Sequence, residues 1–358
     1  MKKSAKILLI CGQEKIKPQY FEAFSFKFFP NFTFLNQLKM KALTFSTFGD
    51  SNVLEYIEIP NPQLKKEEIL VELKAIGLNF ADVYRRKGNY HLKGNPPFIA
   101  GYEGAGIVVD ANNHPEYKVG DRVAFADAPF ANAELVAVNV NHIIPLSENI
   151  SFETAASVLL QGLTAHYLAT DSHKTTKGET VLIHAVAGGV GQILTQISKL
   201  LGATVIGLTS SAEKAKIGFE QGADHVFLYN DDWKSQVFKV VSNGVDVVYD
   251  SIGSTLMESF EVTKECGQVV FFGMAGGDPA PVDPRMLMDG SKTLTGGDLW
   301  SYLNSKEERI KRANQLFGWI IEGKIKLSEP TSFKLSEGKL AHDFLESRKS
   351  TGKIILIP

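Results

Sequence analysis

The chain has 358 residues, 44% of them hydrophobic and 22% charged, a composition ordinary for a globular protein of about two domains. Its formal net charge of −2 gives no electrostatic case for nucleic acid or a membrane surface as partner, and no apolar run approaches the roughly 20 residues of a membrane-spanning helix. Two cysteines, Cys11 and Cys266, are too few for a disulfide framework or a four-thiolate zinc site, so we expect a reducing, cytoplasmic setting.

Residues 1–39 differ from the rest of the chain, because they are basic and rich in phenylalanine. Their one apolar run, residues 7–10, is shorter than the roughly 7–15 residues of a signal-peptide core. Met40 then begins a stretch that reads like a natural start, MKALTFSTFGD. We therefore expect 1–39 to be an N-terminal extension, disordered or produced by a misplaced start. A targeting arm and an ordered segment packed on the body are the alternatives.

From Met40 to about residue 163 the pattern is strand-like. Apolar and polar residues alternate over 71–75, which is the period of a half-buried strand. The sequence at 120–123 marks a tight turn that enters another strand, and 133–136 continues the pattern. We expect this part of the chain to be mostly β, with Gly and Pro turns.

From about residue 164, short apolar strands alternate with helices. A helix after the first strand has apolar residues at helical spacing between Val190 and Leu201, and Gly202 follows as a stop signal. This alternation predicts a parallel sheet with helices on both faces. The tail from about residue 300 holds one long helix and then short segments. The predicted strands are Thr180–Ala185, Thr204–Thr209, His225–Tyr229, Asp246–Asp250, Gln268–Gly273 and Thr293–Thr295.

A glycine-rich loop joins the first of these strands to its helix. Free backbone N–H groups and the positive end of a helix favour an anion there, and glycine lets a diphosphate approach the backbone. A strand precedes the loop, a helix follows it, and a second strand comes at the distance expected of a strand-helix-strand unit. This context predicts a dinucleotide-binding loop, with a variant of the usual glycine spacing. A tight turn serving only helix packing is the alternative. The predicted loop residues are Ala187, Gly188, Gly189, Val190 and Gly191.

The end of the second predicted strand indicates which dinucleotide binds. NAD sites usually carry Asp or Glu there, about 20 residues after the glycines, to hold the ribose hydroxyls. This strand ends instead in Thr209 and Ser210, and Lys214 comes shortly afterwards. Without a carboxylate, a 2′-phosphate is not repelled, and Lys214 is either its partner or a solvated helix lysine. Met274 follows the fifth strand, at the strand end where doubly wound sheets bind ligands.

Several motifs in order resemble the NADPH-dependent quinone oxidoreductases, the zeta-crystallin-like, zinc-free branch of the medium-chain dehydrogenases and reductases. The resemblance runs from about Met40 to Pro358, and Val186, where the family has a small residue, is expected to face the diphosphate loop. It implies an α/β fold with a mostly β, GroES-like catalytic domain over 40–163 and 300–358 and a Rossmann cofactor domain over 164–299. The motifs are GLNFADVYRRKGNY, PPFIAGYEGAGIV, VGDRVAF, LLQGLTAHYL, GETVLIHAVAGGVGQ and ESRKSTGKIILIP.

The resemblance assigns cofactor roles residue by residue. Lys214 matches the family's lysine for the 2′-phosphate, Tyr229 the tyrosine nearby, and Arg348 the arginine that completes the phosphate pocket. Thr164 matches the residue at the nicotinamide end. The implied cofactor is NADPH.

The zinc-dependent branch of the superfamily has a cysteine and a histidine where this chain has Asn79 and Tyr102, so only Glu103 remains of its metal ligands. One carboxylate cannot hold a tetrahedral zinc ion, and no metal site is expected. His184, within an apolar strand, is expected to be a core residue with satisfied hydrogen bonds. Arg85 and Arg86 are expected to be solvated or paired.

Without a metal, the chain has no Lewis acid with which to polarise an alcohol or a simple carbonyl. A quinone is already a strong electron acceptor, so the protein has chiefly to position two rings and exclude water. Asn79, Tyr84 and Tyr90 are the predicted donors to the developing oxyanion, since the family's cleft uses this segment. For each tyrosine the alternative is an ordinary core or cleft-wall residue.

The predicted function is therefore NADPH-dependent reduction of quinones by hydride or electron transfer without zinc. The alternatives are an NADPH-dependent alkenal or enone double-bond reductase and a non-catalytic, NADPH-binding structural or regulatory protein. Family members commonly dimerise edge to edge through the last strand of the parallel sheet, here around 293–297, so a homodimer is also expected.

Overall fold

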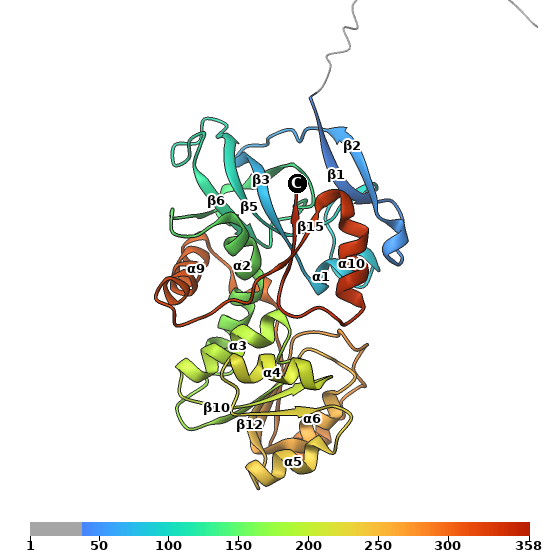
Figure 1. Cartoon of the computed structure of the whole chain (residues 1–358), viewed down its shortest axis with the longest axis vertical. Helices are drawn as coiled ribbons and strands as arrows, with labels where there is room; N and C mark the ends of the chain where they lie inside the picture. Colours follow the sequence, from blue (N-terminus) through green and yellow to red (C-terminus); the bar gives the residue numbers. More distant parts are fainter. Residues whose placement is uncertain (1–37) are drawn as a thin grey trace, which may run out of the picture. The chain divides into compact units, whose positions relative to one another are not determined.

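Three β-sheets organise residues 38–358, the part of the chain that the computed structural model describes (Figure 1). By their contacts these residues form one unit. The extension expected over 1–39 lies outside the described residues except for its last two positions, and the first strand begins at Lys39. The smallest of the three sheets has three strands in the order β2-β1-β4. Its strands are β1 (Lys39–Phe45), β2 (Glu55–Pro60) and β4 (Phe98–Ile99).

A six-stranded parallel sheet occupies the middle of the chain, in the order β11-β10-β9-β12-β13-β14. This order is that of a doubly wound dinucleotide-binding fold, and each predicted strand corresponds to one of its members. The α/β prediction is confirmed. The strands are β9 (Thr180–Ile183), β10 (Thr204–Thr209), β11 (His225–Leu228), β12 (Val245–Asp250), β13 (Thr263–Phe271) and β14 (Thr293–Gly296).

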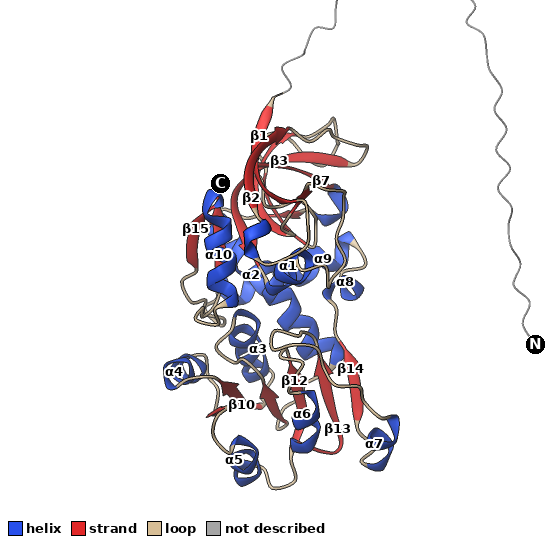
Figure 2. Cartoon of the chain, turned by 90° about the vertical axis from the view of Figure 1, so that its right-hand side faces the viewer, coloured by secondary structure: helices blue, strands red, loops and turns tan. Residues whose placement is uncertain are grey.

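Helices cover both faces of the parallel sheet, with α3 and α4 on one side and α5 and α6 on the other (Figures 1 and 2). Alternate strand residues serve the two faces. Val181 and Ile183 pack in the core beneath α3, whereas Leu182 packs with Trp233 of α5 in the opposite core. The helices are α3 (Gly189–Leu200), α4 (Ala212–Glu220), α5 (Trp233–Val240), α6 (Leu256–Val262) and α7 (Pro284–Asp289).

A seven-stranded, largely antiparallel sheet combines the two ends of the described chain. Its order is β15-β16-β3-β5-β6-β8, with β7 also paired to β3, and only β15 and β16 run parallel. Residues from the tail thus complete the sheet of the first half. The strands are β3 (Glu68–Leu78), β5 (Glu103–Asp110), β6 (Arg122–Ala126), β7 (Leu135–Asn139), β8 (Ile144–Pro145), β15 (Thr331–Lys334) and β16 (Ile354–Ile357).

Two helices here differ from the sequence interpretation. Residues 152–163, grouped with the strand-like part, belong to a helix that begins after Ser151, whose hydroxyl accepts the N–H of Thr154. The tail holds a second helix besides the long one predicted. The helices of this half are α1 (Phe80–Arg86), α2 (Phe152–Tyr167), α8 (Leu299–Tyr302), α9 (Lys306–Ile321) and α10 (Gly338–Glu346).

Helix α2 joins the two larger sheets. It contacts β3 and β5 of the seven-stranded sheet and also α3, which covers the parallel sheet. The boundary expected at 163/164 falls inside this helix, so the domain limits stay a prediction. No helix between residues 38 and 358 has the length and apolar character needed to cross a membrane.

Candidate active site

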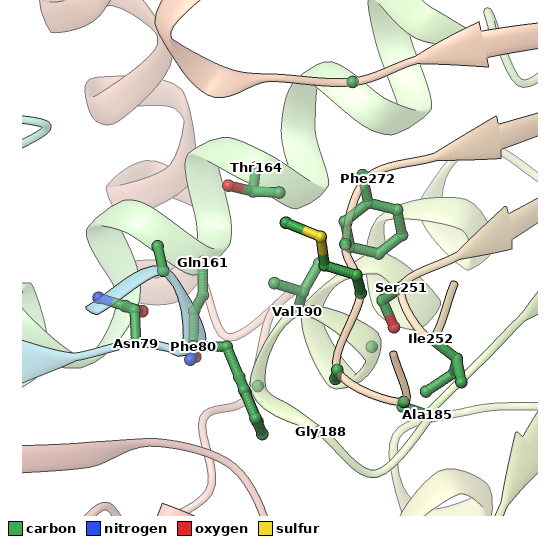
Figure 3. Close-up of a pocket in the computed structure, with 18 of the residues that line it drawn as sticks. Asn79, Phe80, Gln161, Thr164, Ala185, Gly188, Val190, Ser251, Ile252 and Phe272 are labelled. Atoms are coloured by element: carbon green, nitrogen blue, oxygen red, sulfur yellow. The ribbon is translucent and has the colours of Figure 1, made fainter. Parts of the chain in front are cut away.

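One cavity of about 990 Å³ lies between the glycine loop, α1, α2 and the loops that follow β12, β13 and β14 (Figure 3). Every site residue expected from the sequence lines it, although the role of each stays a prediction. The structure brings together Asn79, Tyr84, Tyr90, Thr164, Ala187, Gly188, Gly189, Val190, Gly191, Thr209, Ser210, Lys214, Tyr229, Met274 and Arg348.

The glycine loop opens α3 toward this cavity. Gly188 occupies the N-cap position, and no side chain accepts a hydrogen bond from the first turn of α3. The first-turn N–H groups are therefore free for an anion. At Gly191 a Cβ would lie 2.4 Å from the carbonyl oxygen of Ala185, so only glycine allows the chain to turn this closely.

Val186 does not face the diphosphate loop, and that expectation was wrong. The side chain is fully buried in the core and does not line the cavity. Its atoms lie 2.7 Å and 3.0 Å from where a Cβ would stand at Gly207 and Gly218. Glycines on β10 and α4 thus leave room for a valine in place of a smaller residue.

Tyr229 braces the start of the loop. Its hydroxyl oxygen accepts the N–H of Ala185 at 3.0 Å and lies 3.0 Å from Nδ1 of His184. Nε2 of His184 lies 3.0 Å from the hydroxyl of Ser259, which itself donates to Asp250. Both ring nitrogens are therefore paired, which confirms His184 as a satisfied core histidine, and burial lowers its pKa.

Two cationic side chains line the cavity where α4 meets the segment that follows α10. Lys214 is in the first turn of α4, and its ammonium group donates to the backbone oxygen of Arg348 at 2.6 Å. Burial lowers the pKa of Lys214. Arg348 follows α10 in a left-handed conformation, with φ of 59°. No carboxylate follows β10 directly, so this corner suits a phosphate.

Two tyrosines of the α1 region reach across the cavity to the loops of the parallel sheet. The hydroxyl of Tyr84 accepts the N–H of Met274 at 3.1 Å, and the hydroxyl of Tyr90 donates to Asp298 at 3.0 Å. Burial raises the pKa of both tyrosines, and the Asp298 carboxylate adds to the shift at Tyr90. Both hydroxyls therefore stay protonated near neutral pH.

Asn79 lies in a buried polar network at the start of α1. Its amide nitrogen donates to Oε2 of Glu103 at 2.8 Å, and its amide oxygen accepts from the ammonium group of Lys353 at 2.8 Å. Lys353 also lies 2.5 Å from Oε2 of Glu103. With an ammonium group on its one carboxylate, this set does not fit a zinc ion. Across residues 38–358, no three His, Cys, Asp or Glu side chains cluster closely enough to hold a metal.

Arg85 and Arg86 are paired and buried, not solvated. Arg85 lies 3.2 Å from Asp82, and its guanidinium group lies 3.5 Å from the centre of the Tyr102 ring. Arg86 lies 2.5 Å from Glu346 of α10. The two arginines thus fix α1, which carries Tyr84, against its neighbours.

Sequence reasoning missed several lining residues. Ser251 and Ile252 directly follow β12, and Phe272 follows β13, so the rule that ligands bind beyond the carboxyl ends of parallel strands would have found them. Gln161 lies on α2, with its carboxamide against Gly189 (Figure 3). No short-range pattern marks that residue.

Two protein family models match this chain. Residues 65–180 match the alcohol dehydrogenase GroES-like domain, which confirms that half of the predicted fold, and residues 189–317 match the zinc-binding dehydrogenase family. A quinone oxidoreductase of Pseudomonas aeruginosa is 37% identical over 327 residues, covering 89% of this chain and 99% of that protein.

Solved structures of quinone oxidoreductases and related proteins are also similar to this chain. The Escherichia coli quinone oxidoreductase complexed with NADPH matches with a TM-score of 0.85 at 34% identity, covering 89% of this chain and 100% of that one. A mycobacterial protein complexed with NADPH matches with a TM-score of 0.84 at 38% identity, with the same coverage. The zinc-binding dehydrogenase family is named for its metal, but Asn79, Tyr102 and Glu103 of this chain do not fit a zinc ion.

Proposed function

Because the chain belongs to the quinone oxidoreductase family of the medium-chain dehydrogenases and reductases, we propose that it reduces quinones with NADPH, by hydride or electron transfer and without zinc. One observation carries the proposal. One cavity is lined by the glycine loop, by two cationic side chains, Lys214 and Arg348, and by the tyrosines Tyr84 and Tyr90.

The residues of the cavity fit NADPH, which supplies a hydride to an acceptor when it is bound. The first-turn N–H groups of α3 hold the diphosphate, while Lys214 and Arg348 hold the 2′-phosphate as charge-assisted partners. Thr164 and Met274 line the same cavity, and we assign them to the nicotinamide. Gln161 lies on α2 one turn before Thr164, and its carboxamide lies against Gly189 of the glycine loop.

Tyr84, Tyr90 and Asn79 form the acceptor wall. The tyrosine rings offer flat apolar surface to a quinone ring, with centroids 6.5 Å apart. The Tyr84 hydroxyl accepts the N–H of Met274, and no hydrogen bond within residues 38–358 uses its hydrogen, so it can donate to an acceptor oxygen. The Tyr90 hydroxyl already donates to Asp298 and the Asn79 amide to Glu103, so these two would have to exchange a partner. Since a quinone needs little polarisation, orientation and exclusion of water are the main tasks of this wall.

The test is NADPH consumption against a panel of quinones and enones. Reduction of 1,4-benzoquinone and 1,4-naphthoquinone well above that of 2-hexenal or cyclohexenone supports the proposal. The reverse order would support the enone reductase alternative. Cofactor binding with no turnover on any acceptor would support the non-catalytic alternative. Three relatives that are 35–37% identical to this chain are named quinone oxidoreductases, which favours neither alternative.

Homodimerisation and a cytoplasmic location belong to the same proposal. The exposed edge of the parallel sheet is β14, where Thr293 and Gly296 are open to solvent. Such an edge supports pairing with a second copy of the chain. Light scattering on the purified protein tests this, because Thr295→Pro should convert a dimer into a monomer.

A further inference from the structure

A second, smaller cavity of about 440 Å³ adjoins the main one. Asp127 and Trp300 line both cavities and therefore separate them. Polar side chains dominate the smaller cavity, which suits water better than an apolar ring. It is lined by Asp127, Asn141, His142, Trp300, Leu303, Asn304, Ser305, Lys306, Glu307 and Arg309.

Asp127 lies near the acceptor wall. It directly follows β6, whose residue Ala126 is paired with Glu103 of β5, so Asp127 is placed beside Tyr102. Tyr102 in turn packs edge to face against Trp300, with ring centroids 5.5 Å apart. The Asp127 side chain is 3% exposed, and its φ is 68°, a conformation that aspartate tolerates better than most residues. A buried carboxylate therefore lines the cavity at its acceptor end.

His142 connects this carboxylate to the smaller cavity. Its Nδ1 lies 2.5 Å from Oδ1 of Asp127, and its side chain is 30% exposed. Within residues 38–358, no hydrogen bond involves Nε2 of His142. An imidazole can accept a proton at one nitrogen while it releases one from the other. The geometry thus links water in the smaller cavity to a carboxylate in the main one.

We propose that His142 and Asp127 deliver the proton that quinone reduction consumes, an inference that rests on the proposed function. Reduction of a quinone to a hydroquinone takes one hydride from NADPH and one proton from solvent. Nε2 of His142 takes the proton from water while Nδ1 passes its own to Oδ1 of Asp127. Asp127 gives that proton to the reduced acceptor's oxygen. His142 is left with its proton on Nε2, and a half-turn of the partly exposed ring brings a protonated nitrogen back to Asp127.

The charged groups around the pair belong mainly to α9. Arg309 donates to Oδ2 of Asp127 at 2.8 Å and leaves Oδ1 to His142. Lys306, which is paired with Glu116, and Glu307 line the same cavity. Arg309 also bonds the backbone oxygen of Asn141, so the cluster anchors α9 as well. An anchoring role alone predicts changes in stability and none in proton transfer.

The experiment compares His142→Ala with the wild type on NADPH and 1,4-benzoquinone, with free imidazole as a rescue agent. We expect kcat to fall by about 100-fold, the lower end of the contribution of general acid catalysis. The NADPH dissociation constant should stay within about twofold of the wild-type value, since His142 does not line the cofactor end. Added imidazole should restore part of kcat, and the restored rate should fall in D2O.

His114→Ala is the matched control, because His114 also faces a carboxylate, Glu67, at 3.5 Å but lines neither cavity. Asp127→Asn keeps the left-handed backbone and should lose kcat without rescue by imidazole. If His142→Ala matches His114→Ala in kcat, or if imidazole restores nothing, the relay is wrong. A wild type that binds NADPH but reduces no quinone would instead contradict the proposed function.

Discussion

The ammonium nitrogen of Lys353 lies 2.5 Å from Oε2 of Glu103, and both side chains are buried. Lys353 follows Gly352, whose N–H donates to the backbone oxygen of Ala187 in the glycine loop at 3.2 Å. One short segment thus contacts both the cofactor loop and the network that holds Asn79. The ion pair therefore fixes this segment to the network of Glu103 and Asn79.

Replacing Lys353 with Met should leave the Glu103 carboxylate buried without its cation. Removal of one partner of a buried pair costs about 3–5 kcal/mol. We expect a loss of that size in the free energy of unfolding, measured by urea denaturation. Adding Glu103→Gln should recover part of it. Lys324→Met, which breaks an exposed pair with Glu322, should change stability by under about 1 kcal/mol. If Lys353→Met and Lys324→Met lower the free energy of unfolding equally, the buried ion pair has no special role in stability.

Lys214→Glu should reverse the cofactor preference. The substitution removes a charge-assisted contact and places a carboxylate near the 2′-phosphate, so the KM for NADPH should rise by about 10- to 100-fold. NADH, which lacks that phosphate, should be affected much less or become preferred. Lys216→Glu, an exposed position two residues along α4 that does not line the cavity, is the control. An unchanged KM for NADPH would remove Lys214 from the site.

Gly191→Ala should abolish tight binding of NADPH, because the new Cβ would meet the Ala185 carbonyl oxygen. Since that oxygen belongs to the backbone, the loop itself must shift. We expect at least a tenfold rise in the NADPH dissociation constant, roughly 1.4 kcal/mol, measured by nucleotide fluorescence. Gly318→Ala in α9 is the control, because nothing lies within 4 Å of the added atom, and this variant should bind NADPH as the wild type does. Normal binding by both variants would argue against a diphosphate at this loop.

The buried histidine His342 should make stability fall in mild acid. Its Nδ1 lies 3.1 Å from Arg86, and burial, with the Arg86 charge, lowers its pKa from 6.5 to about 3. The folded state therefore stays unprotonated while the unfolded chain binds a proton below about pH 6.5. This contribution is fully present above that pH and decreases as pH falls, by about 1.4 kcal/mol per pH unit.

His342→Gln should accordingly flatten the pH dependence of the free energy of unfolding between pH 6.5 and 5. Burial also lowers the pKa of His184 and His166, so a smaller slope of the same sign should remain. Urea titrations of wild type and variant at several pH values measure both slopes. Identical slopes would mean that His342 is not held neutral by the fold.

The sequence predicted the parallel sheet well because its strands are short, apolar and spaced by amphipathic helices such as α3. It grouped residues 152–163 with strands because α2 is buried on most of its sides, so no apolar stripe marks it as a helix. The Val186 side chain points into the core because Gly207 and Gly218, which lie in other elements, leave room for it. A single sequence carries no signal for such a fit.

The cofactor end of the site followed from local motifs, whereas the acceptor end did not. The glycine loop and Lys214 each lie within a few residues of a recognisable strand end. The pairs Tyr90 with Asp298 and Asp127 with His142 join elements that only the folded chain brings together. We propose that these contacts hold and protonate the acceptor, and residue spacing does not encode them.

The most direct test is the initial rate of NADPH oxidation by 1,4-benzoquinone after the purified protein has been dialysed against a chelator. The metal-stripped protein should retain its full rate with NADPH and gain nothing from added zinc. No oxidation of NADPH before dialysis, or a rate that is lost on chelation and restored by zinc, would contradict this expectation.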